Sequence, residues 1–199
     1  MSEQGTKPPA DDDDGGDGRV ERDLFACSDT ARSLAASGKP LANRPMQSAT
    51  LDAIQRLERD LLQPIESRFG PITITYGFAG RELTKAVEKR AKADGRLPNI
   101  TPRGDQHAGH ELNTRNGLIC GRGGQAVDLR VPGVATDHVV DWVMDNLPFD
   151  RIYRYGGDHR PFHLSWSAQP LGQVIRMLEK AGGLMVPIVV RRGRVPSKS

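Results

Sequence analysis

An aspartate inside an otherwise apolar strand is the feature that most constrains what this chain can fold into. The segment "QAVDLRV" (125–131) alternates in character, as a half-buried strand does. Alternation places Asp128 on one face and its neighbours Val127 and Leu129 on the other, packed inward. Because an ionised carboxylate that is buried alone is costly, Asp128 needs a partner. A metal ion or an arginine would serve.

Three of the five histidines stand where, together with Asp128, a metal site could be built: His107, His110 and His163. In "FHLSWS" (162–167) the alternation puts His163 on a polar face, which we expect to line a cleft. Two histidines and one carboxylate are a known zinc set that leaves the fourth position open for water. The spacing matches no short motif such as H-E-x-x-H. Hydrogen-bonded loop and strand histidines are therefore the alternative, and the residues by themselves leave both interpretations open.

Helical and strand periods alternate along the chain from residue 50 onward. Apolar residues at helical spacing predict a helix over 50–69, with a kink or break at Pro64. The other expected helices are 81–95, 136–147 and 171–183, and the expected strands are 71–76, 125–131, 151–155, 162–167 and 184–192. Pro187 restricts the last of these strands to a sheet edge. Hairpin-like turns then predict an α+β fold, with a small, mainly antiparallel sheet and flanking helices.

The chain of 199 residues divides into three parts by composition. Residues 1–45, with "GTKPPADDDDGGDG", are too poor in apolar side chains to form a core, so we expect a mostly disordered leader with at most one short helix. Residues 46–168 form the expected domain. Residues 169–199 are expected to form a C-terminal helix followed by a basic tail, "RRGRVPSKS".

Five short motifs, in order, resemble the zinc D-alanyl-D-alanine carboxypeptidase family of metallopeptidases, which includes peptidoglycan-cutting endolysins and the related hedgehog domain. The resemblance extends from Leu51 to Ser167, and the motifs, which begin at Ile72, read "ITITYGFAGRELT", "DQHAG", "GQAVDLRV", "LPFDRI" and "PFHLSWS". The resemblance implies a hedgehog/DD-peptidase-like fold. It also implies that zinc is bound by His107, Asp128 and His163.

This chain departs from the family pattern at three places. An insertion, roughly "HELNTRNGLICGRG", separates His107 from Asp128; loop closure costs little, so the two can still meet, and His110 is the reserve ligand. Ala79 replaces the family's arginine, and Arg81 is the expected source of charge for an oxyanion, with a solvent-facing role as the alternative. Arg160 stands where many members have a catalytic glutamate, so Asp158 is the expected general base, although aspartate is also common in turns.

The resemblance implies a zinc-dependent peptidase that acts on short peptides containing D-amino acids, such as peptidoglycan stem peptides. The alternative is a zinc-binding module without catalysis that contacts a partner. A nucleic-acid role, suggested by the basic tail and by Arg103, Arg115, Arg122 and Arg130, is disfavoured because aromatic residues make up only 5% of the chain. Without a secretory signal or an apolar run of about 20 residues, we expect a cytoplasmic chain with no membrane partner. The oligomeric state stays open.

Overall fold

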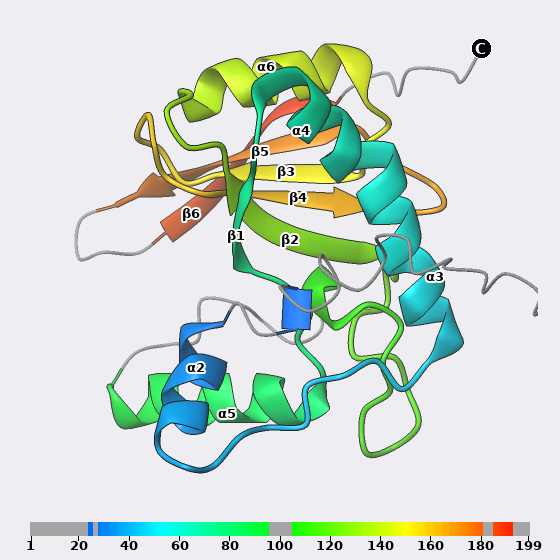
Figure 1. Cartoon of the computed structure of the whole chain (residues 1–199), viewed down its shortest axis with the longest axis vertical. Helices are drawn as coiled ribbons and strands as arrows, with labels where there is room; N and C mark the ends of the chain where they lie inside the picture. The colour runs from blue at the N-terminus through cyan, green and yellow to red at the C-terminus, as the bar shows by residue number, and fades with distance from the viewer. Residues whose placement is uncertain (1–23, 26–27, 96–104, 181–184, 193–199) are drawn as a thin grey trace, which may run out of the picture.

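A six-stranded sheet organises the residues that the computed structural model describes, namely 24–25, 28–95, 105–180 and 185–192 (Figure 1). The order across the sheet is β1-β2-β4-β3-β5-β6. The strands are β1 (Thr73–Tyr76), β2 (Gln125–Arg130), β3 (Arg151–Arg154), β4 (Phe162–Trp166), β5 (Gln173–Glu179) and β6 (Met185–Arg192). The predicted α+β class is confirmed, and the sheet is mixed: β3 and β5 run parallel, whereas the other neighbouring strands are antiparallel.

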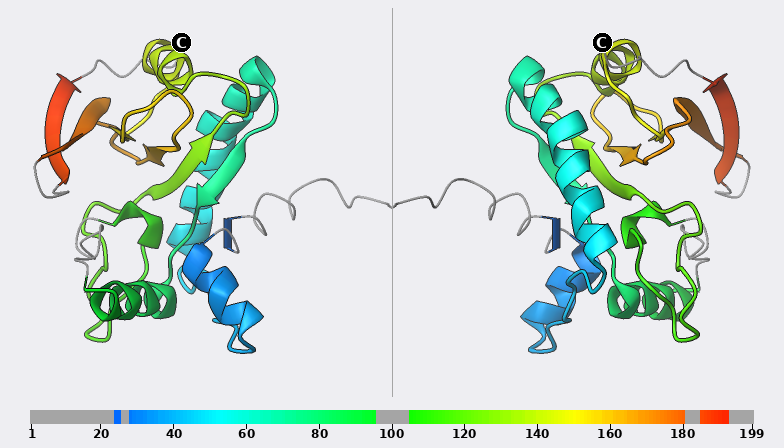
Figure 2. Two further views of the ribbon diagram at one scale, coloured as in Figure 1. Left: turned by 90° about the vertical axis from the view of Figure 1, so that its left-hand side faces the viewer. Right: turned by 90° about the vertical axis from the view of Figure 1, so that its right-hand side faces the viewer.

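Helices cover one face of the sheet and extend below it. They are α2 (Asp29–Ala36), α3 (Ser48–Leu57), α4 (Gln63–Phe69), α5 (Arg81–Ala93), α6 (Thr136–Asn146) and a 3₁₀ turn η3 (Gln106–Ala108). Apolar residues of α3, α4 and α6 bury the inward face of β2, β3 and β4: Leu57, Ile65, Val139, Val140 and Val143 meet Val127, Leu129, Ile152 and Leu164. Figures 1 and 2 show α5 and α2 together beyond the lower end of the sheet. No helix in the described part of the chain has the length and apolar character to cross a bilayer.

The expected break at Pro64 takes the form of a π-helical turn, η1 (Glu58–Leu62), between α3 and α4. The N–H of Gln63 donates to the carbonyl of Glu58, five residues earlier, instead of four. Proline has no N–H to offer to the preceding turn and its ring crowds that turn, so the extra residue accommodates it without ending the helix. α3 and α4 therefore continue as one long rod, seen most clearly in Figure 2.

The C-terminal segment differs from the prediction, because the helix expected over 171–183 is replaced by strand β5. The N–H of Gly172 donates to the Phe149 carbonyl, and the N–H of Gln173 donates to the Asp150 carbonyl. These bonds start the segment along the free edge of β3, and β6 then covers its other edge. Backbone pairing with two strands outweighs the local helical period. β6 lies at the edge of the sheet, as Pro187 predicts, and the tail 193–199 lies outside the described residues.

Within the expected leader the structure describes residues 28–45, where α2 is the one short helix that the sequence allowed, together with Leu24 and Phe25, which pack into the core. Phe25 contacts Phe78 edge-to-face, with ring centroids 5.7 Å apart. Buried Asn43 donates to the carbonyls of Phe25 and Phe78 and accepts from the N–H of Gly80. A few apolar anchors and one saturated amide thus attach a polar segment to the domain. Residues 1–23 and 26–27 lie outside the described part.

The insertion after His107 is tied to the start of α3 by a buried glutamate. The carboxylate of Glu111 accepts from the backbone N–H groups of Met46 and Gln47, at 3.0 and 3.2 Å, and from the Thr50 hydroxyl at 2.9 Å. A carboxylate at a helix N-terminus satisfies donors that the helix itself leaves without partners. Glu111 therefore acts as a cap supplied from a distant part of the sequence.

Replacing this cap should destabilise the fold. We expect Glu111→Ala to lower the free energy of unfolding by about 2–3 kcal/mol, because it leaves several donors without an acceptor. Urea denaturation measures the change as a lower midpoint with an unchanged slope. The matched control is Asp52→Ala, an exposed acid on α3, which should change stability by no more than about 0.5 kcal/mol. Equal effects for the two variants would contradict the capping role.

Candidate metal centre

Strand register places one row of polar side chains across the face of the sheet opposite the helices. Asp128 on β2 pairs with His163 on β4, and His163 pairs with Tyr153 on β3. Tyr76 on β1 pairs with Asp128, after an irregularity in the register. Directly paired residues share a face, so these side chains lie side by side. The alternation predicted from the sequence for Asp128 and His163 thus brings both to the same surface.

The short helix η3 adds His107 to this row. The Asp105 carboxylate caps η3 by accepting from the N–H of His107 at 3.0 Å, and the N–H of Ala79 donates to the His107 carbonyl at 2.9 Å. The imidazole is 2% exposed, and its edge-to-face contact with the Tyr76 ring has a centroid separation of 4.6 Å. Backbone and ring contacts therefore hold this histidine in one orientation.

Three donor atoms converge within one small triangle. His107 Nε2 lies 3.1 Å from His163 Nδ1, His163 Nδ1 lies 3.0 Å from Asp128 Oδ1, and Asp128 Oδ1 lies 3.4 Å from His107 Nε2. In a tetrahedral site with zinc–ligand bonds of about 2.0–2.1 Å, neighbouring ligand atoms are roughly 3.3 Å apart. The triangle therefore has the size of one face of a zinc tetrahedron.

The hydrogen bonds also set which imidazole nitrogen is free to bind a cation. His107 Nδ1 lies 2.9 Å from the Gly77 carbonyl oxygen, an acceptor only, so Nδ1 carries the proton. This leaves the lone pair of Nε2 facing the triangle, which is the arrangement usual for a metal-binding histidine. His163 faces the triangle through Nδ1, which lies 3.0 Å from the acceptor-only Asp128 carboxylate and therefore carries a proton that a bound cation would replace; its Nε2 is buried without a hydrogen-bond partner among the described residues. The His163 ring packs edge-on against Tyr153, with centroids 5.0 Å apart.

The three groups are strongly coupled electrically. Burial alone would raise the pKa of Asp128, but His107 and then His163 hold the pKa of this carboxyl well below its usual range. Burial acts to lower the pKa of His107, yet the Asp128 carboxylate raises it overall. Burial lowers the pKa of His163, and the hydrogen bond that His163 makes to the Asp128 carboxylate opposes this only in part. Asp128 therefore stays ionised and His163 neutral, whereas the raised pKa of His107 favours a proton that a bound cation would have to displace.

The reserve ligand, His110, is used elsewhere. The Nε2 atom of His110 accepts from the backbone N–H of Gly124 at 3.1 Å, and the backbone N–H of His110 donates to the Thr50 hydroxyl. Its ring packs so closely on Gly123 that a Cβ there would lie 2.6 Å from the ring. His110 therefore fastens the end of the insertion to the start of β2, and it does not belong to the cluster formed by His107, Asp128 and His163.

The two predicted catalytic residues lie on exposed positions. Asp158 is in the turn between β3 and β4, where its carbonyl accepts from the N–H of Thr136 and its side chain is exposed. Arg81 starts α5, is about half exposed, and pairs with Glu82 at 3.2 Å. No hydrogen bond or ion pair in the described part of the chain joins Asp158 or Arg81 to the three-residue cluster.

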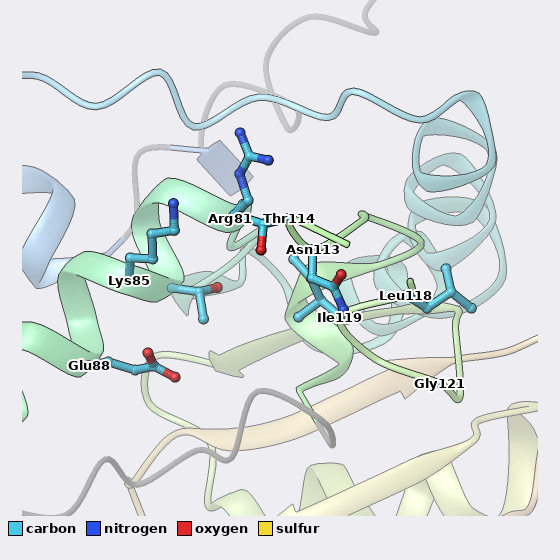
Figure 3. A pocket seen from close by; sticks show the side chains of 9 residues that line it. Arg81, Lys85, Glu88, Asn113, Thr114, Leu118, Ile119 and Gly121 are labelled. Carbon is cyan, nitrogen blue, oxygen red and sulfur yellow. The ribbon is translucent and has the colours of Figure 1, made fainter. Parts of the chain in front are cut away.

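Arg81 lines a separate pocket of about 590 Å³ between α5 and the insertion (Figure 3). Arg81, Lys85 and Glu88 project from successive turns of α5 on one side of it. Asn113, Thr114, Leu118, Ile119 and Gly121 form the other side. None of the three clustered residues lines it, so this pocket and the candidate metal centre are different places.

A buried polar network beneath η3 was not predicted from the sequence. Asp150, fully buried, accepts from Gln106, from the Arg122 guanidinium and from the N–H of Leu171. Gln106 also accepts from the hydroxyl of Ser165, which lies on the same face of β4 as His163. This network fixes η3, and with it His107, over the sheet. Gln106 stands in "DQHAG" and Asp150 in "LPFDRI", but neither motif indicates that these two side chains form a hydrogen bond with each other.

Compared with known proteins, the chain matches no protein-family model, no curated protein and no solved structure.

Substitution of single histidines should separate ligands from structural residues. We expect His107→Ala, Asp128→Ala and His163→Ala each to retain less than about half an equivalent of zinc, because a site needs at least three protein ligands. His110→Ala should retain about one equivalent and lose only roughly 1 kcal/mol of stability, from the lost Gly124 bond. Elemental analysis after dialysis checks this. The matched control is the exposed His159→Ala; zinc loss in His110→Ala would revise the ligand set.

Asp150 should contribute to acid sensitivity. Burial acts to raise its pKa, but Arg122 and Gln106 reverse this and leave it lowered. A lowered folded-state pKa stabilises the protein fully above the ordinary value of about 3.9, and this contribution is lost as the pH falls below it. We expect Asp150→Asn to be less stable at pH 7 and to lose less stability than the parent between pH 4 and pH 2.5. Urea denaturation across this range measures both; parallel curves would refute the assignment.

Proposed function

We propose that the chain is a zinc-dependent peptidase that acts on short peptides containing D-amino acids, such as peptidoglycan stem peptides. The observation that carries this proposal is the triangle of His107 Nε2, Asp128 Oδ1 and His163 Nδ1, with separations of 3.0–3.4 Å. Two histidines and one carboxylate are a catalytic zinc set, and three protein ligands leave the fourth position for water. The motif resemblance supplies the substrate class.

The ligand residues fit zinc chemically as well as in size. Zinc bound here would lower the pKa of its water and polarise a carbonyl group. Gly77 holds His107 in the tautomer that a cation needs, and Tyr76 and Tyr153 pack against the rings of the two histidines. His107 and His163 are buried and Asp128 is half-buried, and this low exposure strengthens any electrostatic interaction made there.

In this proposal Asp158 is the general base. It accepts the proton from the attacking water and passes it to the leaving amine. The turn that contains it leads directly into β4 and so toward His163. Its side chain is exposed and makes no described ion pair, so it is free to approach a bound substrate.

A second function, a zinc-binding module without catalysis, is favoured by one observation. Arg160 stands at the position where the family pattern has a glutamate, three residues before His163. Its carbonyl accepts from the Thr136 hydroxyl, and its guanidinium donates to the Tyr155 carbonyl, so it has a structural role in the turn. This alternative predicts one zinc per chain and no hydrolysis of D-Ala-D-Ala peptides.

Asp158→Asn distinguishes the two functions. For a peptidase we expect kcat to fall by about 10²–10⁴-fold with zinc content unchanged, because a positioned base contributes about that much. Hydrolysis of N-acetylated D-Ala-D-Ala peptides, followed by release of the free amine, provides the rate. The matched control is Asp141→Asn, an exposed aspartate of α6, which should retain the parent rate. Full zinc with no activity in the parent would favour the binding module, and absence of zinc from the parent would reject the metal centre.

A further inference from the structure

The pocket between α5 and the insertion is bounded by two walls that are fixed without a ligand. On one side, α5 is anchored to the domain through Leu83, which is fully buried. On the other side, the insertion forms a tight turn in which the N–H of Asn113 donates to the Gly117 carbonyl at 2.8 Å. The carboxamide oxygen of Asn113 accepts from the N–H groups of Arg115 and Gly117. The pocket is therefore preformed, and its volume of about 590 Å³ lies in the range of small-molecule sites.

The α5 wall of this pocket carries charges of opposite sign at two places. Glu82 pairs with both Arg81 and Lys85, at 3.2 Å each, so two positive groups share one negative group and one positive charge is left over. Glu88, one turn after Lys85, is half-buried and makes no hydrogen bond or ion pair with a described residue. Figure 3 shows Arg81 and Lys85 projecting from one side of α5 and Glu88 projecting from the next turn toward the insertion. The wall therefore presents a positive end and a negative end.

The wall formed by the insertion is apolar, with one amide donor. Leu118 is 45% exposed although its side chain is large and apolar, and it lines the pocket beside the buried Ile119. The oxygen of the Asn113 carboxamide is used inside the turn, whereas no hydrogen bond within the described part of the chain uses its NH₂ group. An apolar group placed against Leu118 would remove apolar surface from water, which is favourable.

We propose that this pocket binds a free α-amino acid with an apolar side chain. The ligand carboxylate pairs with the positive charge at Arg81 and Lys85, its ammonium group pairs with Glu88, and its side chain packs on the apolar wall. A ligand with a single charge would leave one of these protein groups without a partner, whereas a zwitterion satisfies both. Lys85 and Glu88 are three residues apart on one face of α5, about 5–6 Å between Cβ atoms, which suits two charges carried by one carbon. The proposal does not depend on the metal centre.

Equilibrium binding of four related probes to the full chain tests each part of this recognition. The probes are L-leucine, N-acetyl-L-leucine without the ammonium group, L-leucinamide without the carboxylate, and glycine without the apolar side chain. Isothermal titration calorimetry is performed with a chelator present, which removes binding through a metal ion. We expect a dissociation constant of about 1 mM or below for L-leucine. Each of the other three probes should bind about tenfold more weakly, because each lacks one of the three contacts.

Two variants, shown to be folded by thermal unfolding, assign the charged contacts. Glu88→Gln should bind L-leucine about tenfold more weakly than the parent does and should bind N-acetyl-L-leucine within about twofold of L-leucine, because the group that recognises the ammonium is gone. Lys85→Met should remove the preference over L-leucinamide in the same way. The matched control is Arg90→Met, an exposed cation of α5 that does not line the pocket, which should bind L-leucine as the parent does.

Three results would overturn the assignment. The first is no binding of L-leucine to the parent at about 10 mM. The second is equal binding of L-leucine and its two blocked forms by the parent. The third is a loss of L-leucine binding in Arg90→Met as large as the loss in Lys85→Met.

Discussion

The partial burial of one carboxylate on a strand determines much of what surrounds it. Asp128 is tolerated on β2 because His107 and His163 contact it and offset the cost of removing its charge from water. Each imidazole has a separate support: strand pairing for His163, and a capped 3₁₀ turn bonded to Gly77 for His107. Sites that hold their ligands through second contacts are typically the ones that bind a metal in a defined geometry.

A second carboxylate, that of Asp150, holds separate segments of the backbone together. It joins η3, the end of the insertion and the entry to β5, three segments with no strand pairing between them, through Gln106, Arg122 and Leu171. Since Gln106 also contacts Ser165 on β4, the position of His107 depends on residues that never touch a ligand. The insertion is therefore not an independent appendage; His110 and Glu111 fasten it to β2 and α3 at the same time.

Period-two alternation predicted β1, β2 and β4, in which apolar residues alternate with polar ones. The same pattern gave the shared face of Asp128 and His163, and the order of the motifs brought in His107, which the structure places beside them. β5 was mistaken for a helix because Val174, Ile175 and Leu178 also have helical spacing, and only the free edge of β3 decides between the two. Leu24 and Phe25 were missed because two apolar residues in a polar segment give no period.

The sequence distance between the clustered residues has a kinetic consequence. His107 and His163 are 56 positions apart, and Asp128 and His163 are 35 apart, yet each pair meets directly. The entropy cost of closing such long loops arises before the contact stabilises the chain, so chains rich in such pairings fold slowly. The triangle is completed only when β2, β4 and η3 have all assembled, and a cation that fits it would bind few partly folded forms. Such an ion would lower the unfolding rate far more than it would raise the folding rate.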